Sequence, residues 1–100
     1  MRPYETMLLF DARREDAEIE QSLERFSSLV TERGGTIDNV ERWGRRRLAY
    51  EIADMLEGYY AIFTYTVEPD KRQEIEDALP FVEGFVRGKT VRPEVRARKY

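Results

Sequence analysis

The spacing of hydrophobic residues along this chain changes between the period of a strand and the period of a helix. Residues 2–10 alternate, with Leu8 and Phe10 on one side of the segment, which predicts a strand. Within residues 15–33, apolar side chains recur at intervals of four, three and four, which predicts a helix that ends at the glycine pair 34–35. These changes of period delimit the first two elements.

The rest of the chain divides in the same way. A long strand is predicted first, with a bulge or bend at Gly44, and a turn or loop follows at 54–58. A central strand comes next, then a short helix between Pro69 and Pro80, and then a last strand. The three predicted strands are residues 36–52, 59–67 and 85–92.

The predicted order is strand, helix, strand, strand, helix, strand. Two right-handed crossovers around a hairpin give a ferredoxin-like α+β fold, with a four-stranded sheet of the antiparallel type and both helices on one face. We expect residues 1–93 to form a single domain and residues 94–100 to form a basic tail.

Composition excludes most kinds of catalytic and metal site. The chain has no cysteine and no histidine, so disulfides, thiolate chemistry, the usual zinc sites and histidine acid–base catalysis are excluded. We therefore expect no metal, no cofactor and no small-molecule substrate. The sequence has neither a membrane-spanning apolar run nor a signal-peptide pattern, which predicts a cytosolic protein, or an organellar one after removal of a transit peptide.

The net charge of −3 conceals a basic segment in the middle of the chain. Arg42 and residues 45–47 place four arginines within six residues around Trp43 and Gly44. Arginine carries a planar, permanently charged fork that suits phosphate, so the segment predicts a polyanionic partner. The alternative is a charged edge strand that deters aggregation.

Residues 43–52, Trp-Gly-Arg-Arg-Arg-Leu-Ala-Tyr-Glu-Ile, resemble the signature segment of the bacterial small-subunit ribosomal protein S six family. Residues 1–5 resemble the amino terminus of that family, residues 57–60 the start of its third strand, and residues 67–69 the entry to its second helix. The likeness covers residues 1–93. The resemblance implies the ferredoxin-like fold, no catalysis, and binding to small-subunit ribosomal RNA together with the neighbouring protein S eighteen.

Two groups of residues are candidates for the binding sites. We expect ribosomal RNA to contact basic side chains, mainly through its phosphates, at Arg2, Arg45, Arg46, Arg47, Arg87, Lys89 and Arg92. Trp43 and Tyr50 are candidates to stack on an exposed base, with half-buried packing as the alternative role.

The alternation also predicts a candidate protein-binding patch. If Leu8 and Phe10 face the helices, then Met7, Leu9, Tyr60 and Ile62 point to the uncovered face of the sheet. We expect these four side chains to form an exposed apolar patch that binds the protein S eighteen. The alternative is that the long second strand, its loop or the tail shields them.

Three other functions compete with this interpretation. An RNA-recognition motif shares the fold, but the residues around Tyr59 match its octamer only in part, and their phase sends Tyr59 and Ala61 inward. An acylphosphatase-like enzyme would use Arg13 or Arg14 with Asn39, but the glycine-rich phosphate loop is missing. A non-ribosomal adaptor that binds an acidic protein through the basic edge is the third alternative.

Overall fold

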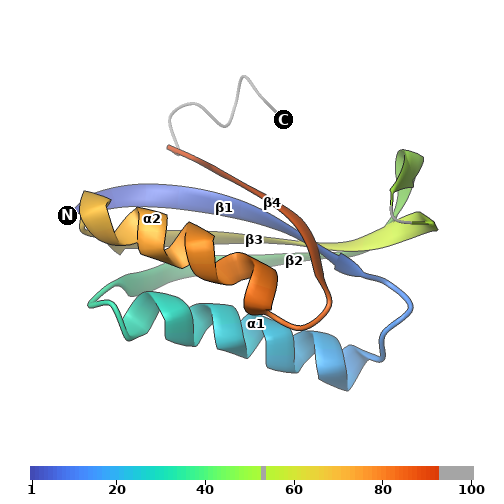
Figure 1. The fold of residues 1–100 in the computed structure, drawn as a ribbon, viewed down its shortest axis with the longest axis horizontal. Helices are drawn as coiled ribbons and strands as arrows, with labels where there is room; N and C mark the ends of the chain where they lie inside the picture. The colour runs from blue at the N-terminus through green and yellow to red at the C-terminus, as the bar shows by residue number, and fades with distance from the viewer. Residues whose placement is uncertain (53, 93–100) are drawn as a thin grey trace.

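The computed structural model describes residues 1–52 and 54–92. Its elements are β1 (Arg2–Asp11), α1 (Asp16–Thr31), β2 (Thr36–Ile52), β3 (Met55–Val67), α2 (Pro69–Ala78), the 3-10 turn η1 (Leu79–Phe81) and β4 (Phe85–Val91). Both helices cover the same face of the sheet, as Figure 1 shows. The predicted basic tail, residues 94–100, lies outside the described residues.

The four strands form one sheet in the order β2-β3-β1-β4, and every neighbouring pair is antiparallel. The predicted ferredoxin-like α+β fold is therefore confirmed. The central strand β1 pairs with β3 along its whole length, from Arg2 opposite Val67 to Asp11 opposite Gly58. The long strand β2 lies at one edge and β4 at the other, so both carry backbone groups that no further strand of the described chain covers.

The main core lies between the helices and the sheet. In α1, the side chains of Ile19, Leu23, Phe26 and Val30 form the predicted apolar stripe, and all are buried. This helix begins with a capping box. The Glu15 side chain accepts a hydrogen bond from the backbone N–H of Glu18, and the Glu18 side chain accepts one from the backbone N–H of Glu15. The ring of Phe26 packs 4.6 Å from that of Phe63, which fixes the helix on β3.

The hairpin between β2 and β3 differs from the prediction. The pattern predicts a turn or loop over residues 54–58, but the structure places the start of β3 at Met55, which pairs with Ile52. The chain reverses direction between Ile52 and Met55, where Asp54 adopts a left-handed conformation with φ of 62°. Because Met55 is buried, strand pairing at this end is reinforced by packing that local turn preferences do not reveal.

Candidate nucleic-acid and protein interface

The sheet presents the predicted candidate residues on its helix-free face. Met7 pairs with Ile62 and Leu9 pairs with Tyr60 across β1 and β3. Their neighbour Leu8 is in the helix-side core. Because successive side chains of a strand alternate between faces, the four candidates point away from the helices, as the alternation predicted.

The expectation that all four side chains are exposed is wrong. Leu9 is 4% exposed and Ile62 is fully buried, while Met7 and Tyr60 are half-buried. Leu9 packs with Leu48 and Met55 in a second hydrophobic cluster. Ile62 is flanked in the sheet by Met7 on β1 and by Glu41 on β2. The alternation predicted the correct face, but the end of the β2–β3 hairpin covers part of it.

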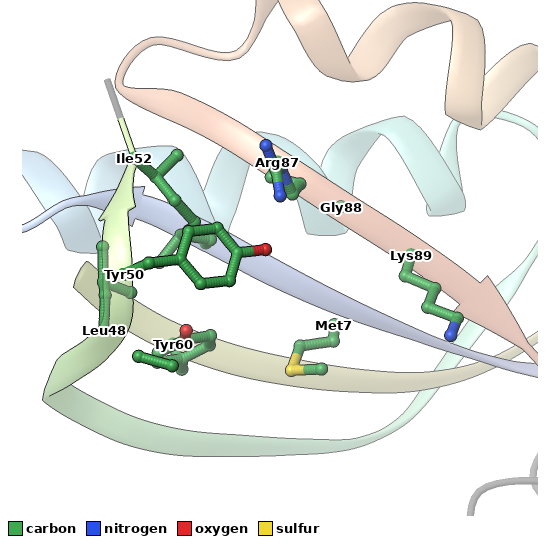
Figure 2. Close-up of a pocket in the computed structure, with 10 residues that line it drawn as sticks. Met7, Leu48, Tyr50, Ile52, Tyr60, Arg87, Gly88 and Lys89 are labelled. Carbon is green, nitrogen blue, oxygen red and sulfur yellow. The ribbon is translucent and has the colours of Figure 1, made fainter. Parts of the chain in front are cut away.

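What remains open on this face is a hollow of ≈ 260 Å³, shown in Figure 2. Its lining includes Met7, Leu9 and Tyr60 of the two central strands, and Leu48, Tyr50 and Ile52 of the end of β2. Arg87 and Lys89 of β4 line the other side. Tyr50 is 68% exposed beside the hollow. The site is therefore an apolar depression with cationic side chains along one wall.

The arginines of β2 do not act as one group. Arg45 turns toward the start of α1, where its guanidinium donates to the backbone oxygens of Ala12 at 3.0 Å and Arg14 at 2.8 Å and to Asp16 Oδ1 at 2.7 Å. Arg42 behaves similarly, because it donates two hydrogen bonds to the Glu20 carboxylate, and the same contact raises the pKa of Arg42. These two side chains tie β2 to α1.

A β-bulge lies between Arg42 and Arg45. The pairing with β3 shifts between Arg42 and Gly44, so Trp43 is the additional residue, and Gly44 has a φ of 79°, which favours glycine. The bulge predicted at Gly44 is thus confirmed. The Arg46 guanidinium lies 5.8 Å from the centroid of the Trp43 ring, and its Nε donates to the Trp43 backbone oxygen at 3.1 Å. Arg46 and Arg47 are both exposed.

The remaining basic candidates lie on and beyond β4. Arg87 sits opposite Leu9 and Lys89 opposite Met7, on the helix-free face. Arg2 and Arg92 line a second hollow of ≈ 480 Å³ together with Arg72, a residue that the sequence analysis missed. Arg72 belongs to no recognisable motif, so no signal in the sequence distinguished it from an ordinary surface residue of a helix.

The basic side chains thus form two groups at opposite ends of the sheet. Arg46 lies opposite Gly58, whereas Arg2 lies opposite Val67, nine residues further along β3. At ~3.3 Å per residue, these points are about 30 Å apart. Arg87 and Lys89 lie between the two groups along β4. A bound polyanion would therefore have to extend along the sheet to contact both ends.

The residues of the enzyme alternative are used elsewhere. Arg13 donates from Nε and Nη2 to the Asp11 carboxylate at 2.9 and 2.8 Å, and these hydrogen bonds lower the pKa of Asp11. Arg14 donates to Ser22 Oγ at 2.8 Å and to the backbone oxygen of Glu83. Both arginines therefore serve as local ties between loops and elements. For the RNA-recognition alternative, Tyr59 packs against the helix-side core rather than facing solvent.

Within residues 1–52 and 54–92, no helix has the length and apolar character needed to cross a membrane. In the same ranges, no group of three acidic side chains is arranged to hold a metal ion.

Known proteins similar to this chain include ribosomal proteins matched over nearly its full length. The family model described as Ribosomal protein S6 matches residues 3–92. The small ribosomal subunit protein bS6 of Arthrobacter sp. (strain FB24) is 46% identical over 94 residues, which cover 94% of this chain and 93% of that protein. The protein of the same name from Acidothermus cellulolyticus is 42% identical over 96 residues, or 96% of this chain and 100% of that protein.

The structural comparison agrees with the sequence comparisons. The crystal structure of 30S ribosomal protein S6 from Thermotoga maritima matches with a TM-score of 0.88 and 32% sequence identity, covering 98% of this chain and 92% of that one. The resemblance carried by residues 43–52 is therefore confirmed, and the relatives are ribosomal structural proteins rather than enzymes. The chain belongs to the ribosomal protein S6 family of the small ribosomal subunit.

Proposed function

We propose that this protein binds small-subunit ribosomal RNA through its exposed basic side chains and docks the neighbouring ribosomal protein S eighteen on the helix-free face of its sheet. The observation that carries the proposal is the apolar hollow on that face, with Arg87 and Lys89 along one wall. Exposed apolar surface beside cationic residues suits a protein partner and a polyanion that meet at one place.

The RNA contacts are assigned to the arginines and lysine that face solvent. Arg46 and Arg47 at one end, Arg87 and Lys89 along β4, and Arg2 and Arg92 at the other end are all exposed. Such side chains reach phosphates without disturbing the core. Arg45 is assigned a different role, because hydrogen bonds from all three of its guanidinium nitrogens hold it against the start of α1. Its role is to position the basic segment.

The protein contact is assigned to Met7, Tyr60, Leu48 and Tyr50 around the hollow, with the buried Leu9 and Ile62 supporting them from within the sheet. Tyr50 combines high exposure with a large apolar ring and a polar tip, which is typical of residues that dominate interface energies. Trp43, at 36% exposure beneath Arg46, is a platform for either a base or a partner side chain.

The test is the affinity for a central-domain fragment of small-subunit ribosomal RNA, measured against salt with and without protein S eighteen. We expect log affinity to fall steeply with log salt, and the Arg46→Ala/Arg47→Ala double variant to flatten that slope by about 1.4 to 1.8. Arg25→Ala is the control for loss of a basic side chain outside the proposed contacts, because Arg25 is exposed on the helix side. A slope near zero, or equal losses in both variants, would contradict the proposal.

A further inference from the structure

The hollow around Arg2, Arg72 and Arg92 lies where the start of β1, the first turns of α2 and the end of β4 meet. Tyr4 and Thr90 also line it, and none of its lining residues is acidic. Three guanidinium groups thus line one hollow, and a cluster of arginines favours the binding of an anion. The three charges come from separate elements, so the fold itself brings them together.

Arg72 is held in a defined position. Its guanidinium lies 5.8 Å from the centroid of the Tyr4 ring, and Tyr4 is only 6% exposed, so the ring is a fixed support. Arg72 Nη1 also lies 2.7 Å from Glu76 Oε1, one turn further along α2. A guanidinium carries five N–H donors, so this ion pair leaves others to be directed at a ligand. A side chain already fixed in this way loses less entropy when it binds.

Two acidic residues, Glu68 and Asp70, flank Pro69, which lines the hollow. The Glu68 carboxylate lies 3.7 Å from the amino-terminal nitrogen of Met1, and the positive charge of this amino group offsets that of the carboxylate. Asp70 is exposed, and neither carboxylate lines the hollow. The hollow is open to solvent and, at ≈ 480 Å³, is larger than a phosphate group. These dimensions favour one phosphate of a polymer, whose neighbouring units leave on both sides, over an enclosed small anion.

We propose that Arg2, Arg72 and Arg92 bind one backbone phosphate of an RNA strand in this hollow. This inference rests on the proposed function and adds to it a second point of attachment, about 30 Å along the sheet from Arg46. It also assigns a binding role to Arg72, whose planar fork suits two phosphate oxygens at once.

The chain offers a matched pair of variants for the test. Lys71 and Arg72 are adjacent on α2, and each forms an ion pair within the helix, Lys71 with Glu74 at 3.3 Å and Arg72 with Glu76. Lys71 does not line the hollow. We expect Arg72→Gln to weaken binding to the central-domain RNA fragment about tenfold near ~0.1 M salt and to reduce the log–log salt slope by about 0.7 to 0.9. Lys71→Gln should change the affinity less than about twofold, since exposed charges away from a contact contribute little.

Two further variants separate phosphate binding from folding. Arg72→Lys keeps the charge without the fork and should recover only part of the affinity. Arg2→Gln leaves the contact between Arg72 and Tyr4 in place, so it should weaken RNA binding without the change in stability that loss of this contact could cause. Thermal unfolding of each variant shows that the measurements are made on folded protein.

A titration with inorganic phosphate, followed by amide and guanidinium NMR signals, identifies the source of the anion. Shifts at the three arginines only at high phosphate concentration, together with the RNA losses, support the assignment. Saturation by free phosphate with unchanged RNA affinity in Arg72→Gln would overturn it in favour of a small-anion site. Equal RNA affinities of Arg72→Gln and Lys71→Gln, with a loss in the Arg46/Arg47 double variant, would overturn this inference alone. Failure of the wild-type protein to bind RNA would overturn the proposed function as well.

Discussion

The side chain of Leu9 occupies the space that a Cβ atom at Gly58 would need. A Cβ built at Gly58 meets Leu9 Cδ1 and lies 3.4 Å from Leu48 Cδ2. We expect Gly58→Ala to destabilise the fold by about 1–3 kcal/mol, because overpacking forces buried side chains to move. Denaturant unfolding measures the change.

The companion variant for this test is Leu9→Val, which removes the Cδ1 atom that would clash. In a double-mutant cycle, Gly58→Ala should cost less in the Leu9→Val background than in the wild type. Strictly additive effects would show that Leu9 is not the obstacle at this position.

The second prediction concerns the buried phenol of Tyr65. Its Oη lies 2.7 Å from Thr6 Oγ1, and burial raises the pKa of Tyr65 above its ordinary value. A raised pKa in the folded state means that the associated stability is fully present below the unfolded pKa of ~10 and is lost as pH rises through the folded pKa. The wild-type protein should therefore lose stability at alkaline pH.

Tyr65→Phe removes the ionisable group. At neutral pH we expect it to cost about 1 kcal/mol through the lost hydrogen bond. Between pH ~9 and ~11 the variant should lose less stability than the wild type, as measured by urea unfolding. Tyr50→Phe is the control, because Tyr50 is exposed, and it should follow the wild-type pH profile. Parallel alkaline losses in all three proteins would refute the role given to Tyr65.

The third prediction separates Arg45 from Arg47. Arg45→Ala removes hydrogen bonds to two backbone oxygens and an exposed ion pair with Asp16, so it should lower the free energy of unfolding by about 1 kcal/mol. Its effect on RNA affinity at a temperature where it is folded should be less than about twofold, because its guanidinium is already engaged. Arg47→Ala should show the reverse pattern. If Arg45→Ala weakens RNA binding more than Arg47→Ala does, the assignment of roles on β2 is wrong.

The sequence predicted which face each side chain of the central strands occupies, but it did not predict which of those side chains are covered. Alternation placed Leu8 and Leu9 on opposite faces, because a strand has a period of two. The burial of Leu9 arises from the end of β2, where Leu48 packs across the sheet. That contact depends on the register shifts between Arg47 and Ile52, which a hydrophobic pattern does not encode.

The same limit applies to the charged residues. The density of arginines around Gly44 predicted a basic segment, and most of it is exposed. The different roles of Arg45 and Arg46 follow from the alternation of side chains along β2 and from the position of α1, which is a tertiary feature. Arg72 was missed for the same reason, because it is far from Arg2 in the sequence and only the fold brings the two side chains to one hollow.

The most direct test of the account is incorporation into reconstituted small ribosomal subunits that lack their own S six protein. Met7→Lys places a charge in the apolar hollow, and Gln21→Lys adds the same charge to the exposed side of α1 as a control. Ile62→Lys is unsuitable, because Ile62 is fully buried and the variant would be expected to unfold. We predict that wild-type protein and Gln21→Lys co-sediment with the particles in equal amounts, while folded Met7→Lys is retained at least about tenfold less, the equivalent of ~1.4 kcal/mol of binding free energy. Equal retention of folded Met7→Lys and Gln21→Lys would contradict the claim that the protein joins the subunit through the helix-free face of its sheet.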